Sequence, residues 1–337
     1  MHACIRNSDA GVHQNRFGGT RHVVHRPGQR SSAMTCPINS QVHIPVTARS
    51  EARPIRPFGP GTHLWEWGGD MRVWLIYGAA AFVLQGTHPI VAKGVFDHST
   101  VFTDPYGRGI RSFEATQRWI YGGEQAYDEA RKLRDIHRTI QGSDYEGKRY
   151  HALNAEPYAW VWATGWFTFL PAVRSFSREP VTRETERQLY TEMQDLGRIL
   201  GVAERMIPDT LEDFEAYLAG MLEQLRAGHP DMAAGLEVFS VIPAPPYVPR
   251  ALWSPVGRVA GGFALFVIAA YGPPLLRDLL GEYAGYTWTR RRQWKADALV
   301  RSVQIVGPFI PERLRYVPST YRARRRARRT PSLTMVR

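Results

Sequence analysis

One histidine and three arginines share a helical segment in the first half of the chain. His137 lies within about 80° of arc of three apolar side chains at about 100° per residue, so its imidazole projects from the buried face of a helix. A buried imidazole beside guanidinium groups suits a haem, because imidazole binds iron and guanidinium pairs with propionates. From the helical period alone, a hydrogen-bonded core histidine beside a solvated basic flank is the favoured interpretation. The apolar residues are Ala130, Leu133 and Ile140, and the arginines are Arg131, Arg134 and Arg138.

Several other metal and nucleotide chemistries are excluded by what the sequence lacks. Cys4 and Cys36 are the two cysteines, which excludes from the rest of the chain a disulfide framework, a cysteine zinc site, an iron–sulfur cluster and a thiolate-ligated haem. Neither E-x-x-H nor H-E-x-x-H occurs, so the usual di-iron and zincin helices are excluded too. The segment 142–148 matches G-x-x-x-x-G-K, but Arg149 follows where a phosphate-binding loop needs Ser or Thr.

The net charge of +12 does not describe the middle of the chain, because the basic residues are concentrated near the two ends. Residues 1–58 carry eight Arg and two acidic residues, and residues 313–337 carry nine Arg and no acidic residue. The segment 59–312 between them is slightly acidic, so the basic pI gives no reason to expect a specific nucleic-acid partner. We expect 313–337 to be a solvated basic tail that makes weak, non-specific contact with anionic membrane surfaces, RNA or DNA.

Residues 1–58 lack the apolar period of a folded segment. They are rich in Arg, His, Ser, Pro and Gly, which predicts a disordered basic arm. The arm contains no apolar run of about 7–15 residues, as a signal peptide would. We therefore expect a cytoplasmic protein, with peripheral contact as its route to a membrane.

The segment 59–312 has the periodicity of helices and no convincing run of strict alternation, which predicts an all-α class. One helix is expected over 183–200, with Thr182 as its N-cap. Another begins at a capping box formed by Thr210 and Asp213 and ends before Gly228.

Three apolar stretches, 73–84, 158–173 and 259–276, raise the question of membrane spans. A spanning helix needs about 20 apolar residues. The first two stretches are shorter, and the third contains several glycines and prolines. We expect all three to be buried core helices, and shallow membrane association is the alternative.

A series of short motifs occurs between residues 88 and 157. It runs HP-x-V-A (88–92), D-P-x-x-R-x-x-R-S (104–112), H-x-x-x-x-G (137–142), G-x-x-Y-x-A (147–152) and E-P (156–157). In order and spacing it resembles the oxygenase family of the latex-clearing proteins, which are rubber oxygenases carrying haem b. The same family includes the ER-bound oxygenase of mycophenolic acid biosynthesis. The resemblance covers roughly residues 60–312 and implies a haem-binding oxygenase-like helical domain over 59–312.

The resemblance also implies a haem ligand. A helical histidine is the proximal ligand in that family, and His137 stands at the matching position. Arg134 and Arg138 would then help to bind the haem. His88 and His151 are competing histidines to which the resemblance gives no role.

On the distal side, the family's R-x-x-K-T stretch matches Arg108, Arg111 and Ser112. These three residues would line the oxygen site and polarise bound O2. The lysine that can bind iron in rubber oxygenases is replaced by Arg111, which stays protonated and cannot take that role. The resemblance does not place the carboxylate proposed as a base in rubber cleavage, because Ala92 stands sixteen residues before Arg108. These departures speak against rubber cleavage itself and leave the haem-protein interpretation in place.

From the residues and the resemblance together, we expect a single large all-α domain with a globin-like core and one haem b. The expected function is oxygenation of an apolar small-molecule or polymer substrate, of alkene or isoprenoid type, with O2 bound opposite His137. The aromatic stretch 158–169 would either line the substrate pocket or pack in the core. Two alternatives stay open: a non-catalytic haem- or lipid-binding protein held to a membrane by its basic tail, and a helical scaffold without a cofactor.

Overall fold

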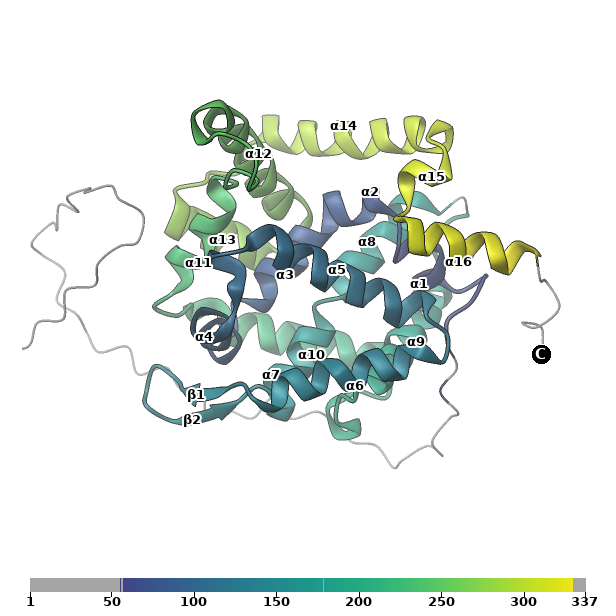
Figure 1. Ribbon diagram of the computed structural model, residues 1–337, viewed down its shortest axis with the longest axis horizontal. Helices are drawn as coiled ribbons and strands as arrows, with labels where there is room; N and C mark the ends of the chain where they lie inside the picture. Colours follow the sequence, from purple (N-terminus) through teal and green to yellow (C-terminus); the bar gives the residue numbers. More distant parts are fainter. Residues whose placement is uncertain (1–54, 56, 178, 330–337) are drawn as a thin grey trace, which may run out of the picture. The chain divides into compact units, whose positions relative to one another are not determined.

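The computed structural model describes residues 55, 57–177 and 179–329, which belong to the compact unit Ser40–Arg337. In these residues the fold is helical apart from one short β-hairpin (Figure 1), which confirms the predicted all-α class. The expected N-terminal arm, with both cysteines, lies outside the described residues up to residue 54. The globin-like arrangement of the core stays a prediction.

The helices follow one another with short connections. The first half of the domain holds α1 (His63–Trp67), α2 (Met71–Val73), a π-helical turn (Trp74–Gly78), α3 (Ala79–Gln85), α4 (Pro89–His98), α5 (Pro105–Tyr121), α6 (Gln125–Arg138), α7 (Ala155–Ala163) and α8 (Trp166–Phe176). The second half holds α9 (Arg183–Leu200), α10 (Leu211–Gln224), α11 (Met232–Ser240), α12 (Arg250–Tyr271), α13 (Pro274–Ala284), α14 (Arg290–Val306), α15 (Glu312–Arg315) and α16 (Pro318–Arg329). Between α6 and α7, β1 (Gln141–Ser143) pairs antiparallel with β2 (Arg149–His151).

The caps of α9 and α10 confirm the boundaries expected from the sequence. The Thr182 side chain accepts a hydrogen bond from the backbone N–H of Thr185, and α9 ends at Gly201 in the left-handed conformation, with φ 77°. The Thr210 side chain accepts from the N–H of Asp213 at 3.1 Å. Because these polar side chains satisfy the first free amides, both helices begin where the sequence predicts.

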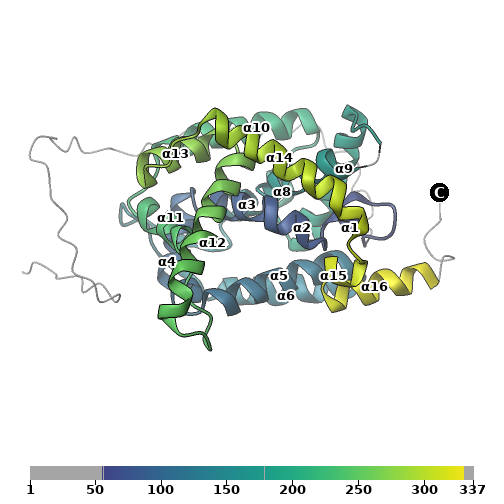
Figure 2. The same ribbon diagram turned by 90° about the horizontal axis from the view of Figure 1, so that it is seen from above.

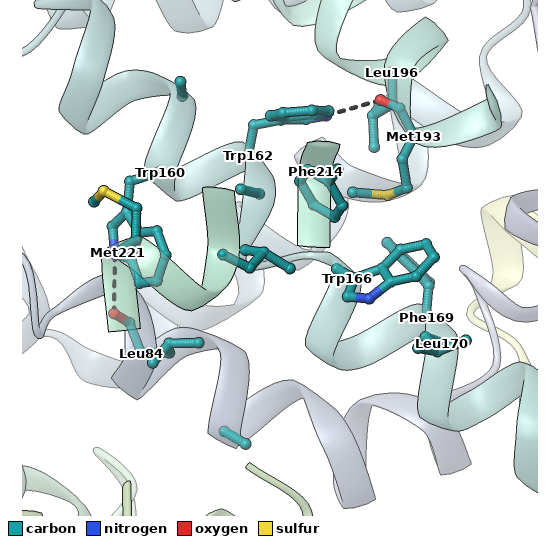
Figure 3. Packing of buried hydrophobic residues seen from close by; sticks show 14 of the residues in the cluster. Leu84, Trp160, Trp162, Trp166, Phe169, Leu170, Met193, Leu196, Phe214 and Met221 are labelled. Atoms are coloured by element: carbon teal, nitrogen blue, oxygen red, sulfur yellow. Dashed lines mark hydrogen bonds between the residues drawn. The ribbon is translucent and has the colours of Figure 1, made fainter. Parts of the chain in front are cut away.

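The core lies between α7, α8, α9 and α10, where aromatic side chains pack among a larger number of aliphatic ones (Figure 3). The Trp160 Nε1–H donates to the Leu84 carbonyl oxygen at 3.1 Å, and the Trp162 Nε1–H donates to that of Met193 at 2.8 Å. Phe214 of α10 is fully buried among them. The aromatic stretch after residue 158 therefore packs in the core, and the indole N–H groups of Trp160 and Trp162 are satisfied by backbone oxygens.

The carboxylate of Glu192 on α9 joins this core to the first helix. It accepts hydrogen bonds from the backbone N–H groups of His63 at 2.9 Å and of Leu64 at 2.8 Å. These amides begin α1 and would otherwise be unsatisfied. Burial raises the pKa of Glu192 to about 7, although both backbone hydrogen bonds oppose the shift.

The end of the chain, as far as residue 329, packs onto the body. Thr320 and Arg324 of α16 are buried. The Thr320 hydroxyl donates to Gln117 Oε1 on α5 at 2.7 Å, and Arg324 donates to the Trp65 carbonyl oxygen at 2.9 Å and to the Glu66 carboxylate at 2.8 Å. The segment from 313 to 329 therefore differs from the expected solvated tail at Thr320 and Arg324, which dock α16 on the body. Most of its other arginines are exposed, as expected: Arg313, Arg322, Arg325, Arg326, Arg328 and Arg329. Buried polar bonds hold a segment whose sequence has few apolar residues.

Of the three apolar stretches expected in the core, the last one, most of which belongs to α12, is only partly buried. In the most apolar 18-residue window of α12, only 22% is buried. By length and composition α12 could cross a membrane, and the pair Met71–Gln85 and Pro89–His98, bent by 98°, could count as a second such segment. The prediction of a buried core helix over 259–276 is wrong at its start, where Val259 and Phe263 are exposed, and it is confirmed from Val267 to Ala269. Apolar composition does not reveal what covers a helix.

Candidate functional site

Helices α5 and α6 form a helical hairpin and lie side by side (Figure 2). Residues 122–124 connect them, and Arg118 of α5 pairs with Glu129 of α6 at 3.0 Å. Because the chain doubles back, the first turns of α5 and the last turn of α6 lie at the same end of the hairpin. This end carries Arg108 and His137.

The imidazole of His137 is half-buried and held in one orientation. Its Nδ1 lies 2.8 Å from the Leu133 carbonyl oxygen, which can only accept, so Nδ1 carries the proton and donates. The Tyr158 ring meets it edge to face at 6.0 Å between centroids. Burial lowers the pKa of His137, and the nearby charges of Arg108 and His151 add to the shift, while the Leu133 hydrogen bond opposes it. The imidazole is therefore neutral at pH 7, with the lone pair on Nε2.

Arg108 and Ser112 occupy the same face of α5, one turn apart. The Arg108 Nη1–H donates to the Ser112 hydroxyl oxygen, and its Nε–H lies 3.4 Å from the Ser99 hydroxyl oxygen. The guanidinium is half-buried, and its charge lowers the pKa of His137. Two of the three expected distal residues therefore lie together, at the end of the hairpin that also carries His137.

The third expected distal residue, Arg111, points elsewhere. Its side chain is 57% exposed and pairs with the Asp104 carboxylate at 3.1 Å. It also donates to the Thr100 hydroxyl oxygen at 3.0 Å. Asp104 caps α5 by accepting from the Gly107 N–H, so Arg111 stabilises the start of that helix.

The two arginines expected to bind a haem on α6 have different surroundings. Arg134 donates to the Gly201 carbonyl oxygen at 2.6 Å and so ties α6 to the end of α9. Arg138 is exposed and pairs with Asp135 of its own helix at 2.7 Å. Arg138 is free to turn toward a ligand at small cost, whereas Arg134 would have to release Gly201.

The other histidines of the described residues have partners of their own. His63 is hydrogen-bonded to the Gln188 side chain, and His229 Nε2 lies 2.7 Å from the Gly86 carbonyl oxygen. In His151, Nε2 lies 3.1 Å from the Arg138 carbonyl oxygen and Nδ1 accepts from the Leu153 N–H. In the buried His88, Nδ1 accepts from the Ile90 N–H, so Nε2 carries the proton and cannot bind a metal. His98 is exposed. Among the described residues, a half-buried imidazole whose Nε2 has no hydrogen-bond partner occurs at His137.

Sequence reasoning missed some of the groups that shape the site. Tyr158 orients the His137 ring but stood in the aromatic stretch assigned to pocket or core. Ser99 lies outside the recognised motifs. Glu156, whose carboxylate lies 3.9 Å from His88 Nε2, belongs to the E-P motif, yet the motif gave no sign of that partner.

This arrangement can supply one nitrogen ligand, together with N–H and O–H donors beside it. No three His, Cys, Asp or Glu side chains of residues 55, 57–177 and 179–329 come together in a way that could hold a metal ion. A haem needs no such cage, because the porphyrin provides four nitrogens and the protein adds an axial ligand. The donor set at the end of the α5–α6 hairpin therefore fits a haem better than a protein-built metal centre.

Comparison with known proteins agrees with the resemblance in the motifs. A search of the curated proteins and a search of the solved structures each found no match. The family model described as "ER-bound oxygenase mpaB/B'/Rubber oxygenase, catalytic domain" matches residues 65–305. This span includes every motif from His88 to Glu156 and the whole α5–α6 hairpin. The chain therefore belongs to the oxygenase family of mpaB/B' and the rubber oxygenases and carries its catalytic domain.

Proposed function

We propose that the chain is a haem b-dependent oxygenase for an apolar substrate of alkene or isoprenoid type, in which His137 would bind the haem iron. The observation that carries the proposal is the free Nε2 of a neutral, half-buried imidazole whose Nδ1 is fixed on the Leu133 carbonyl oxygen. A backbone acceptor on the second nitrogen sets the tautomer and ring orientation that a metal-binding histidine needs. Membership of an oxygenase family supports the reaction class.

Bound haem would supply the oxygen chemistry, which no side chain of the site can perform. Arg108 and Ser112 present donors on one helix face, and such donors stabilise negative charge that develops on oxygen. Arg111 acts from a distance in this proposal, because its pair with Asp104 fixes the start of α5, and with it Arg108. Arg138 can reach a propionate after leaving Asp135.

An apolar substrate is supported by the family match, because its description names rubber oxygenase and rubber is a hydrocarbon polymer. Ile136, next to His137, is 62% exposed, and Ile110 of α5 is 58% exposed. Single exposed apolar residues are common on protein surfaces, so these two carry no argument for a substrate path.

The test is haem content after expression with haem supply. Wild type should purify with a Soret band and about one haem per chain, and His137→Ala should lose both. His151→Ala is the matched control, since that ring is also half-buried but both nitrogens are engaged. A His137→Ala protein that keeps full haem while His151→Ala loses it would overturn the ligand assignment.

A non-catalytic haem- or lipid-binding protein at a membrane is the second candidate, and the exposed first half of α12 favours it. Oxygen uptake separates the two proposals. The haem-loaded protein should consume O2 with an isoprenoid alkene and not with the corresponding saturated hydrocarbon. Equal uptake with both, or none with either alkene or alkane, would support the binding protein.

A further inference from the structure

The first half of α12 presents an apolar stripe that none of the described residues covers. Leu252, Val256, Val259 and Phe263 follow one another at spacings of four, three and four, so they share one helix face. Leu252 is 72% exposed and Val259 is 75% exposed. Four large apolar side chains in a continuous exposed row are unusual for a surface in water.

Helix α14 lies on the same side of the protein as α12, at the top of Figure 1 and toward the viewer in Figure 2. A groove of about 350 Å³ joins them, with Phe263 and Phe266 on the α12 side and Arg292 and Lys295 on the α14 side. Trp294 of α14 is 69% exposed. We call the exposed residues of α12 and α14, with this groove, the α12–α14 face.

The charge of this face is almost entirely positive. Helix α12 has Arg250 and Arg258 and no acidic residue. On α14 the single acidic residue, Asp297, stands against five basic ones: Arg290, Arg291, Arg292, Lys295 and Arg301. Apolar side chains, an exposed tryptophan and surrounding basic residues are the combination that binds the interface of an anionic lipid layer.

We propose that the α12–α14 face docks on the surface of an anionic lipid bilayer, with the apolar stripe of α12 inserted at the level of the headgroups. The proposal does not depend on haem or on the oxygenase reaction. It assigns the face to a partner by charge complementarity, because the basic residues would meet lipid phosphates and carboxylates while the stripe meets acyl chains.

Helix α12 is long enough to cross a membrane, but its packing holds it at the surface. A side chain at Gly257 would meet the Ile242 carbonyl oxygen at 2.4 Å, and one at Gly261 would meet that of Ser240 at 2.0 Å. The Trp253 Nε1–H donates to the Ile242 carbonyl oxygen at 2.9 Å. The second half of the helix is buried from Val267 to Ala269. Spanning would break all of these contacts, whereas shallow insertion uses only the exposed stripe.

The other possible occupants of the face carry the wrong charge. A second copy docked symmetrically would place basic residues against basic residues, which is unfavourable. Residues 1–54 of the chain contain seven Arg and two acidic residues, so they are cationic as well. An anionic surface is therefore the partner that the face fits.

The first experiment measures binding of the full chain to phosphatidylcholine vesicles with and without phosphatidylserine, by co-sedimentation. We expect binding to the anionic vesicles, weakened by salt, and little binding to the neutral ones. Val259→Asp should lower the partition coefficient about tenfold or more, because it puts a charge into the inserted stripe. Ile136→Asp is the matched control, since Ile136 is also exposed but lies on α6, and it should bind as wild type does.

The second experiment changes charge alone. Arg290→Glu with Arg291→Glu should lower anionic-vesicle binding by at least about tenfold. Arg131→Glu with Lys132→Glu on α6 makes the same change of net charge and should have a much smaller effect. Circular dichroism should be unchanged in all of these variants, and haem content should be unchanged in the α12 and α14 variants. If the α6 variants lose binding as strongly as the α12 and α14 variants, the face is not the docking site and the proposal is wrong.

A dimer is the other outcome to exclude. If the wild-type chain ignores anionic vesicles but self-associates in analytical ultracentrifugation, and Val259→Asp abolishes that association, a second copy covers the face and the lipid proposal is overturned. Vesicle binding by a monomer, lost in Val259→Asp, supports it.

Discussion

The aromatic core between α7 and α10 and the α5–α6 hairpin satisfy their polar atoms in different ways. In the core, the indole N–H groups of Trp160 and Trp162 donate to backbone carbonyl oxygens that cannot move away. In the hairpin, polar side chains mostly bond to other side chains on the surface, as Arg108 does with Ser112 and Arg138 with Asp135. The core therefore has one low-energy arrangement, whereas the hairpin can exchange partners at little cost. A ligand is more easily accommodated in the second region.

The largest test of this comparison removes an aromatic ring from the core. Phe214→Ala should lower the free energy of unfolding by about 3–5 kcal/mol, because it leaves a cavity next to Tyr190, which stacks on it at 4.7 Å. Ile136→Ala in the hairpin should change it by no more than about 0.5 kcal/mol. Urea unfolding followed by circular dichroism measures both. Similar losses in the two variants would show that the hairpin is packed as tightly as the core.

A smaller effect is expected where the end of the chain supports the hairpin. Arg324→Ala removes charged hydrogen bonds to the Trp65 carbonyl oxygen and the Glu66 carboxylate and should cost about 1.5–3 kcal/mol. Arg328→Ala, which removes an exposed pair with Glu312, should cost less than about 1 kcal/mol. Hydrogen exchange should rise in α1, α5 and α16 of Arg324→Ala and stay unchanged in α9. Uniform exchange across the protein would contradict the separation of the two regions.

Within the hairpin, the two arginines of α6 should differ. Arg134→Ala loses a charged hydrogen bond to Gly201 and should lower the free energy of unfolding by about 1–2 kcal/mol. Arg138→Ala removes a local exposed ion pair and should lower it by no more than about 0.5 kcal/mol. Thermal unfolding of both variants is sufficient. Equal effects would mean that Arg134 does not link the hairpin to α9 in solution.

The smallest effect is a pH dependence at the buried His229, outside both regions. Burial lowers the pKa of His229 below its usual 6.5, although its hydrogen bond to the Gly86 carbonyl oxygen opposes the shift. The unfolded chain therefore takes up a proton at higher pH than the folded one, so this contribution to stability is present above pH 6.5 and is lost as the pH falls below it. The stability of wild type relative to His229→Gln should decrease as the pH is lowered from 7.5 to 5.5. An unchanged difference would mean that His229 titrates normally.

Much of the fold could be predicted from the sequence, because helix boundaries depend on local chemistry. The Thr182 and Thr210 side chains accept hydrogen bonds from amides in the first turns of α9 and α10. The sequence around each threonine is therefore sufficient to predict where the helix begins. What covers a helix depends on distant residues, and that is where prediction failed. Nothing near α12 in the sequence shows that Val259 is uncovered, and nothing near α16 shows that Glu66 receives Arg324.

In the candidate site, too, the features that depend on local sequence could be predicted, and those that depend on other side chains could not. The helical period placed His137 on the inner side of α6, and the structure gives it a half-buried position. The spacing of Arg108 and Ser112, one helical turn, also predicts that they share a face. Arg111 could not be placed, because its direction is set by Asp104 and Thr100, and a motif match carries no information about such partners.

The two hydrogen bonds that Glu192 accepts from the start of α1 determine where the chain can be truncated for expression. The family match begins at residue 65, which invites trimming to that position. Such a cut would delete the His63 and Leu64 amides and leave a carboxylate inside the protein without its donors. Trimming at residue 305, where the match ends, would remove Arg324, and the Glu66 carboxylate would lose its charged hydrogen-bond donor. The shortest version that keeps both ends of the domain intact runs from before Ile55, because Ile55 and the buried Phe58 pack on the core, to Arg329.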